Sequence, residues 1–458
     1  MVEHIRNMLN IPELRKKLGV TLMLLIVYRV GSHIPIPGVN LAALKEFEKE
    51  MGTSAIGGVL SLYDTISGGA IGNLAIFSLG IMPYISASII FSLLTKVVPS
   101  LEELSKEGHS GQQKINEWTR YATVPLCIVQ SILIVNMIMG SRAGGGISLI
   151  SPDVPKALFY TMAVVTLTGG ALFLMWLGEQ ITEYGVGNGI SLLIMAGIVT
   201  DLPNAVVLLV TPPGGSGESD SSGIPILVVI LVLFVGVVMG VILMSQAQRR
   251  LPIQYAKHTR GRRVYGGQKA HLPIRINMAG VMPVIFASSL MIFPSTIGAM
   301  LGSDFIREMF RFGSFWYIAI YIGMIYFFSY FWTSLMFQPT EWANQMKEHG
   351  SFIPGIRAGK NTAQFLNDVM TRITFVGAAF LCVIALLPQM VIFLIRIIFQ
   401  RGEDPGLGAW VGAQFLGGTG ILIVVGVVLD LVQKLEGHLL MRHYTGFVKR
   451  GRIKGRMG

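Results

Sequence analysis

The sequence predicts an all-α polytopic membrane protein, and three observations carry this prediction. The residues AVILMFWYC make up 52% of the chain and the charged residues only 13%, against about a quarter charged in ordinary soluble domains. Ten apolar runs are long enough to cross the hydrocarbon core of a bilayer, which takes about 20 helical residues each. A short motif in the first half of the chain recurs in the second half. These features together predict ten transmembrane helices arranged in two five-helix halves.

The apolar runs are expected to be helices because lipid offers the backbone no hydrogen-bond partner, and a barrel strand would need only about ten residues. The start of the chain has no apolar core followed by a small-residue cleavage site, so we expect the first run to be kept as a span. The expected spans lie at residues 18–34, 74–94, 121–140, 157–177, 187–210, 224–247, 277–299, 316–337, 373–395 and 415–432.

Lys and Arg are distributed unevenly between the two sides of the expected membrane domain. With ten spans both termini share one side, and 27 of the 36 Lys and Arg residues lie in the tails and loops of that side, against eight on the other. Cytoplasmic loops carry the excess of positive charge. We therefore expect a multi-pass protein with both termini in the cytoplasm. The basic tail, residues 433–458, fits anionic lipid or ribosomal RNA equally well.

An internal repeat supports the division into halves. Residues 80–89 read GIMPYISASI and residues 280–289 read GVMPVIFASS, with six of ten positions identical. Pro83 and Pro283 occupy matching places, and proline marks an interrupted helix. Since the two copies lie in spans that run in opposite directions, we expect two halves, residues 1–210 and 211–458, related by an inverted repeat. Chance similarity between apolar segments is the alternative.

The segment that precedes the second span, residues 56–75, reads IGGVLSLYDTISGGAIGNLA. It is too polar and too rich in glycine for a comfortable span, yet too apolar for an ordinary solvated loop. Irregular backbone is tolerated at membrane depth only when it is buried in protein or lines a cavity. We interpret the segment as a re-entrant element that fills a pore from outside; a loop lying on the surface is the alternative.

The residues that carry chemistry in other protein classes form no catalytic, metal or cofactor pattern here. Cys127 and Cys382 lie inside apolar runs, where thiols behave as small hydrophobic groups. No nucleotide-binding glycine loop is present, and the histidines lie in tails, loops or span edges. Glu179 and Glu183 are one helical turn apart in a stretch that we read as a short cytoplasmic turn, where capping and solvation explain them. We expect no enzyme activity and no cofactor.

Isoleucine recurs at helical spacing in the spans. Ile81 and Ile85 share one helix face, as do Ile190 and Ile194. Such pairs usually serve packing, and the residues alone favour that interpretation. The inverted repeat and the broken helices also suit a secondary solute transporter, which would need polar ligands near the middle of the membrane.

Four long stretches resemble the SecY/Sec61-alpha family, which provides the central pore subunit of the Sec translocon. They are SGGAIGNLAIFSLGIMPYISASII at 67–90, MWLGEQITEYGVGNGISLLIMAGIV at 175–199, QYAKHTRGRRVYGGQKAHLPIRINMAGVMPVIFASS at 254–289, and FIPGIRAGKNTAQFLNDVMTRITFVGA at 352–378. The resemblance covers nearly the whole chain. It implies a clamshell of two halves, an hourglass pore, a plug formed before the second span, and a lateral gate between the second and seventh spans.

The function that the resemblance implies is a protein-conducting channel of the bacterial cytoplasmic (inner) membrane. It would translocate unfolded secretory polypeptides and release membrane-protein segments sideways into lipid, driven by an external motor or a ribosome. The implied partners are SecE-like and SecG-like small membrane subunits, the motor ATPase SecA, the ribosome, signal peptides, unfolded preproteins and membrane lipids.

The resemblance also assigns residues to three sites. The pore ring, which takes the place of the packing interpretation given above, falls on Ile81, Ile85, Ile190, Ile194, Ile285 and Ile423. The plug spans about residues 60–72 and includes Leu60, Ser61, Leu62, Tyr63, Asp64, Thr65, Ile66, Ser67, Gly68 and Gly69. Two large cytoplasmic loops, about residues 248–276 and 338–372, would bind SecA or the ribosome through Arg249, Arg250, Lys257, Arg260, Arg262, Arg263 and Arg357.

Overall fold

The computed structural model describes most of the chain and divides it into two compact units. Unit 1 comprises Met1–Asn204 and Val427–Gly458, and unit 2 comprises Ala205–Gly426. The described residues are 11–40, 64, 67–140, 142–143, 147–148, 150–151, 154–210, 223–255, 257–260, 263–266, 269–301, 304–310, 314–398 and 419–450. The boundary between the two units lies after Asn204, inside a helix, whereas the expected halves meet at residue 210. The residues from Val427 to the C-terminus belong to unit 1, although they were expected in the second half.

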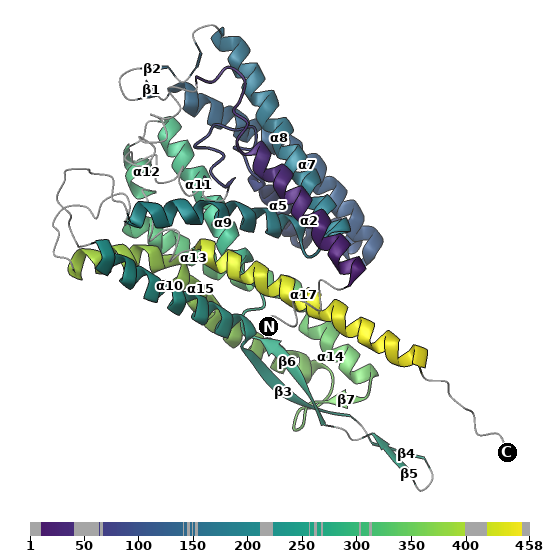
Figure 1. Ribbon diagram of the computed structural model, residues 1–458. Helices are drawn as coiled ribbons and strands as arrows, with labels where there is room; N and C mark the ends of the chain where they lie inside the picture. Colours follow the sequence, from purple (N-terminus) through teal and green to yellow (C-terminus); the bar gives the residue numbers. More distant parts are fainter. Residues whose placement is uncertain are drawn as a thin grey trace. The chain divides into compact units, whose positions relative to one another are not determined.

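Unit 1 is built from helices with one short strand pair (Figure 1). Its elements are α2 (Pro12–Gly31), α5 (Met82–Val97), α6 (Pro99–Lys106), α7 (His109–Gly140), β1 (Arg142–Ala143), β2 (Ile147–Ser148), α8 (Lys156–Tyr184), the first part of α9 (Gly189–Val210) and the last part of α17 (Thr419–Arg450). Proline stands in the first turn of α2, α5 and α6, where its missing N–H would have no helical partner.

A sharp break separates α5 from α6. The two helices meet at an angle of 99°, and Val98 between them is extended, with φ −98° and ψ 112°. The break is caused by Pro99, because the proline ring disfavours helical backbone at the residue before it. The apolar helix α5 is thereby turned into the short amphipathic helix α6, of which Leu101 is the buried residue.

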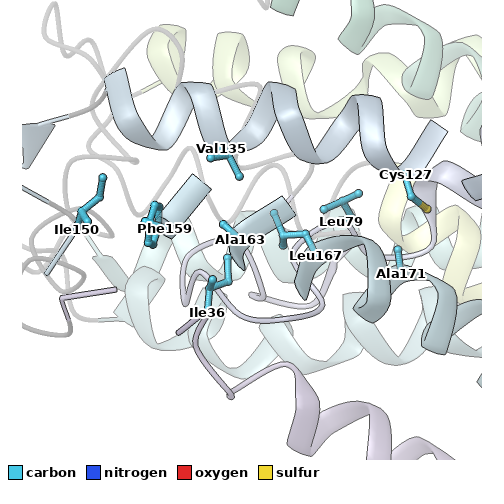
Figure 2. Close-up of a cluster of buried hydrophobic side chains, with 9 residues drawn as sticks. All are labelled: Ile36, Leu79, Cys127, Val135, Ile150, Phe159, Ala163, Leu167 and Ala171. Atoms are coloured by element: carbon cyan, nitrogen blue, oxygen red, sulfur yellow. The ribbon is translucent and has the colours of Figure 1, made fainter. Parts of the chain in front are cut away.

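The core of unit 1 forms where α7 and α8 pack side by side against non-helical chain. Figure 2 shows this cluster, in which Leu79 and Ile36 belong to segments without regular structure. The remaining members drawn there are Cys127, Val135, Ile150, Phe159, Ala163, Leu167 and Ala171. Small residues on α8 allow close approach, as is common between helices in membranes. The buried Cys127 confirms the interpretation of this thiol as a small hydrophobic group.

Unit 2 combines long helices with a small sheet. Its helices are α10 (Gly223–Gln246), α11 (Met282–Leu301), α12 (Asp304–Met309), α13 (Phe315–Met336), α14 (Pro339–Glu348) and α15 (Lys360–Ile398), together with the last part of α9 and the first part of α17. Its strands are β3 (Gln248–Tyr255), β4 (Lys257–Arg260), β5 (Arg263–Gly266), β6 (Lys269–Arg275) and β7 (Ser351–Phe352). The antiparallel sheet has the order β6-β3-β7, and β4 and β5 form a separate hairpin.

The sheet of unit 2 packs on α14 and α15 through a compact apolar cluster. Leu251 of β3 and Ile274 of β6 face Met346 of α14 and Leu366 of α15, all of them buried. Fully burying one such side chain contributes about 1.5–3 kcal/mol. The sequence analysis treated residues 248–276 and 338–372 as loops, so this sheet and its core were not predicted.

A helix overlaps each of the ten expected spans, although several boundaries differ. Within the described residues, four helical stretches have the length and hydropathy to cross a membrane: His109–Asn136, Lys156–Tyr184, Phe315–Glu348 and Lys360–Met390. The bent pair of α5 and α6 passes the same test as one broken span. The protein is therefore an α-helical polytopic membrane protein, and the number of ten crossings stays a prediction.

Candidate functional site

The most unusual feature of unit 1 is a buried stretch of irregular backbone, residues 67–80, which we call the buried segment. Residues 74–81 were expected to begin the second span, but α5 starts only at Met82. Turns fill the preceding residues instead, and Leu74 and Gly80 have positive φ angles of 41° and 55°. Ala70, Leu74 and Leu79 are completely buried. Because the described part of residues 56–75 lies inside the protein, the alternative of a surface loop is wrong for that part.

One end of the buried segment is held by backbone hydrogen bonds. The residues that follow α2 run antiparallel to it, with Pro35 opposite Ala75. The Ile36 amide donates to the Leu74 carbonyl at 2.8 Å, and the Ile76 amide donates to the Ile34 carbonyl at 2.9 Å. Buried irregular backbone must satisfy its polar groups in this way. Residues 74–76 are thus paired with residues 34–36 through the main chain, and the Ser78 hydroxyl donates to the Ala75 carbonyl at 2.6 Å.

The other end of the buried segment is held by side chains. The Asp64 carboxylate accepts hydrogen bonds from the amides of Ile71 at 2.8 Å and Gly72 at 3.0 Å. The Ser67 hydroxyl donates to the Asp64 carbonyl at 3.0 Å. Short polar side chains commonly cap turns in this manner. Of the expected plug residues, Asp64, Ser67, Gly68 and Gly69 are brought together here, whereas Leu60, Ser61, Leu62, Tyr63, Thr65 and Ile66 lie outside the described residues.

Two side chains of α2 complete the set of contacts. The Tyr28 hydroxyl donates to the Ser67 carbonyl at 2.9 Å, and the Arg29 guanidinium donates from Nη1 to the Gly68 carbonyl at 3.2 Å. Neither Tyr28 nor Arg29 was among the residues that the sequence assigned to a site. The Arg29 guanidinium could have indicated such a contact, because a charged side chain in an apolar helix needs a partner.

Gly68 lies between α2 and α9 with no space for a side chain. A Cβ atom at this position would stand 2.8 Å from the Gly197 Cα atom and 2.9 Å from the Tyr28 hydroxyl. The φ angle of Gly68 is +71°, a conformation that L-residues rarely adopt. The glycine is therefore required both by the backbone conformation and by the close approach of α9.

The six isoleucines of the expected pore ring are shared between the units. Ile81 and Ile85 lie at the start of α5, and Ile190 and Ile194 lie at the start of α9 in unit 1. Ile285 of α11 and Ile423 of α17 belong to unit 2. All but Ile190 are buried, and a Cβ placed on Gly178 of α8 would stand 3.2 Å from the Ile190 Cγ1 atom. The ring itself stays a prediction.

The expected partner-binding residues lie on the sheet, on the hairpin and in one turn. Arg249 and Arg250 are exposed on β3, paired in register with Ile274 and Pro273. Lys257 and Arg260 lie on β4, Arg263 lies on β5, and Arg262 lies outside the described residues.

Arg357 is exposed in residues 353–359, which we call the basic turn. Gly355 and Gly359 have φ angles of 85° and 104° there, and the Thr362 hydroxyl donates to the Arg357 carbonyl at 3.0 Å. The backbone of the turn is therefore held to α15 while the guanidinium is left in solvent.

The carboxylate pair at Glu179 and Glu183 occupies a different setting from the one expected. Both residues lie on α8, which continues to Tyr184, and not in a turn. Glu179 forms an ion pair with Arg120 of α7, with 2.6 Å between Nε and Oε1. The earlier placement was wrong because the helix extends beyond its apolar run. Within the described ranges, no group of three His, Cys, Asp or Glu side chains could hold a metal ion.

Fold and site together define the class: a polytopic α-helical membrane protein whose first unit encloses a stretch of irregular backbone. The SecY family model matches residues 75–432, and the chain belongs to the SecY family. It is 40% identical to the protein translocase subunit SecY of Thermotoga maritima, over 100% of both chains. It is also 40% identical to the protein of that name from Escherichia coli K12, covering 97% of this chain and 96% of the relative.

Solved structures of similar fold are channels. One, described as the structure of a protein conducting channel, has a TM-score of 0.59 at 19% identity and covers 93% of this chain and 92% of its own. A second, with a TM-score of 0.58, 19% identity and the same coverage, concerns the plug domain of SecY and the closed state of its channel. A third is Sec61 in the canine ribosome-channel complex, with a TM-score of 0.56, 17% identity and again 93% and 92% coverage.

Proposed function

We propose that this chain is the pore subunit of a protein-conducting channel in the bacterial cytoplasmic membrane. It translocates unfolded secretory polypeptides and releases membrane segments sideways into lipid. The observation that carries the proposal is the match along the full length, at 40% identity, to relatives named protein translocase subunit SecY. The similar fold of a protein-conducting channel supports it.

Residues 60–72 serve as the plug of this channel. The support comes from the tightly held described residues at the C-terminal end of this stretch and from the glycines Gly68, Gly69 and Gly72, where the backbone can turn. A plug must close the passage in the idle state yet be removable. Hydrogen bonds from side chains to single backbone atoms suit both needs, because they can be broken without unfolding a helix.

The pore ring consists of Ile81, Ile85, Ile190, Ile194, Ile285 and Ile423. Branched apolar side chains can close around a polypeptide without hydrogen-bonding to it, so they tolerate any sequence. A narrow apolar constriction also empties of water, which hinders the leakage of ions. A secondary transporter would place polar ligands at this point instead.

The sheet, the hairpin and the basic turn form the cytoplasmic face that receives SecA or the ribosome. Exposed arginines there offer planar donors for carboxylates of a motor protein or phosphates of RNA. One solved structure of similar fold is a channel bound to a ribosome. SecE-like and SecG-like subunits complete the channel, the substrates are signal peptides and unfolded preproteins, and both termini are cytoplasmic.

The test is reconstitution of the chain with SecE-like and SecG-like subunits into lipid vesicles. With SecA and ATP, a secretory precursor should become protected from added protease, and vesicles lacking this chain should give none of this protection. If protection does not exceed that of empty vesicles, while the Thermotoga maritima relative prepared in the same way is active, the proposal is wrong.

A further inference from the structure

The last turn of α2 contacts two consecutive carbonyl groups of the buried segment. Tyr28 donates to Ser67 at 2.9 Å and Arg29 donates to Gly68 at 3.2 Å. The contacts join residues 39 positions apart in the sequence. Both are made by side-chain donors and so are not part of the backbone hydrogen bonding of α2. Their effect falls on the position of the buried segment.

The chemistry of both donors explains why they seek this backbone. Tyr28 is 5% exposed, and a buried phenol usually finds a hydrogen-bond partner. Arg29 carries a permanent charge in an apolar helix, where charged side chains are expensive and turn toward protein partners. A carbonyl oxygen bonded to a guanidinium forms a charge-assisted hydrogen bond, which is stronger than one between neutral groups.

The two ends of the buried segment are held in different ways, and this difference points to a direction of movement. Residues 74–76 are paired through the main chain with residues 34–36. Ser67 and Gly68 are held to α2 by two side chains, and Gly68 approaches Gly197 of α9 so closely that a Cβ would be 2.8 Å from its Cα atom. Ser67 and Gly69 also bond to Asp64 and Asn73, but within the same stretch of chain. Loss of the two side-chain bonds would therefore remove the hydrogen bonds that tie Ser67 and Gly68 to α2, while residues 74–76 stay paired with residues 34–36.

We propose that Tyr28 and Arg29 act as a latch that keeps the plug in the idle position, and that opening requires both hydrogen bonds to break. This inference rests on the proposed function, because it concerns the regulation of the same plug. Both are positioning residues: they determine how often the plug leaves, not what the channel carries.

The experiment compares Tyr28→Phe, Arg29→Gln and the double variant with the unaltered channel. Tyr330→Phe is a matched control, since the Tyr330 hydroxyl also donates to a backbone carbonyl, that of Thr371 at 3.3 Å, but on α15 of unit 2. The first readout is the ion conductance of idle channels in planar bilayers. The second is the labelling rate of Ser67→Cys by a water-soluble maleimide in a background lacking Cys127 and Cys382, because Ser67 is 2% exposed.

Tyr28→Phe, which removes the neutral hydrogen bond, should raise the idle conductance and the labelling rate about threefold to tenfold. Arg29→Gln, which removes the charged donor, should raise both about tenfold or more. The double variant should exceed each single variant, and Tyr330→Phe should match the unaltered channel. Equal labelling and conductance in folded Tyr28→Phe and Tyr330→Phe channels would overturn the latch. Tyr28→Phe decides the question alone if Arg29→Gln fails to fold, because it removes one oxygen atom without changing the ring.

The design separates failure of the latch from failure of the proposed function. If the unaltered channel shows no translocation in vesicles, the proposed function is wrong, whereas the Ser67→Cys labelling rates still test whether Tyr28 and Arg29 hold the segment. If the unaltered channel translocates but the labelling rates do not differ between variants and control, the channel function stands and the latch is wrong.

Discussion

The buried segment of unit 1 and the basic turn of unit 2 are both rich in glycine, and they use it for different purposes. Gly68 is required because a side chain would meet α9 and Tyr28 at less than 3 Å. Gly355 and Gly359 have positive φ angles, yet a Cβ on either would find nothing within 4 Å. In the first region glycine permits close packing, and in the second it only permits a turn. A glycine-rich sequence therefore does not by itself distinguish a buried element from an exposed one.

The largest expected effect concerns the side of the membrane that the basic turn faces, with Ser219 of an expected external loop as the reference. Single cysteines at Ser219 and Ala358, in a background lacking Cys127 and Cys382, should react in opposite ways with an impermeant maleimide applied to intact cells. Ser219→Cys should be labelled and Ala358→Cys should not, because the excess of Lys and Arg marks the basic turn as cytoplasmic. Broken cells should label Ala358→Cys and so provide the control. The reverse pattern in intact cells would contradict the orientation.

Charge reversal in the basic turn should separate function from stability. Arg357→Glu should lower ATP-driven import of a precursor into vesicles roughly tenfold or more, since a contact with a partner becomes repulsive. Its unfolding free energy should change by less than about 0.5 kcal/mol, because the side chain is exposed. Lys156→Glu at the start of α8 makes the same change of charge at an exposed residue outside the two expected binding loops, and it should import normally. Normal import by Arg357→Glu, or its failure to fold, would each remove the partner-binding role.

The packing around the buried segment can be tested at two adjacent glycines of α8. A Cβ on Gly170 would stand 2.1 Å from the Ile76 carbonyl oxygen, whereas a Cβ on Gly169 would meet nothing within 4 Å. Gly170→Ala should destabilise unit 1 by roughly 1–3 kcal/mol through overpacking. Gly169→Ala should be neutral or stabilise by up to about 1 kcal/mol, because alanine favours the helix.

The unfolding temperature of the two glycine variants can be measured through a buried cysteine. A thiol-reactive dye should report the heat-induced exposure of Cys127 in unit 1, in a background in which Cys382 is replaced by Ala. Identical unfolding temperatures for Gly169→Ala and Gly170→Ala would show that α8 does not press on the buried segment.

The smallest expected effect is the loss of one hydrogen bond under the basic turn. Thr362 is 2% exposed and donates to the Arg357 carbonyl, so Thr362→Val should cost about 1 kcal/mol. That corresponds to a decrease of roughly 2–4 °C in unfolding temperature, followed through Cys382. Thr371→Val removes an exposed hydroxyl from the same helix and should change little. Import of the precursor should fall partially in Thr362→Val. If Thr362→Val and Thr371→Val have the same unfolding temperature and the same import, the turn is held by other contacts.

The long helices could be predicted from the sequence because the lipid environment leaves apolar helices as the economical solution. The sheet of unit 2 could not. Pro252 and Pro273 lie in β3 and β6, and proline within a run argues against a strand. In the structure Pro252 pairs with His271 of β6, while β7 pairs with Gln254 and Tyr255 further along β3.

The candidate site was predicted in part. Composition indicated a re-entrant element before α5, whereas Arg357 was assigned to partner binding through the family resemblance. The contacts of Tyr28 and Arg29 could not be predicted, because each depends on a fold that brings together residues 39 positions apart. The pore ring rests on the family resemblance, and isoleucine spacing alone favoured ordinary packing.

The sheet also determines how segments of unit 2 can be exchanged. Strand β3 pairs with β6 on one side and with β7 on the other, and β7 stands almost a hundred residues later in the chain. Two segments that the sequence separates by several helices are therefore one structural module. A chimaera that replaces residues 248–276 with those of a relative, while keeping residues 338–372, would join strands that did not evolve together. Both segments should be exchanged as a pair if such a chimaera is to keep the sheet.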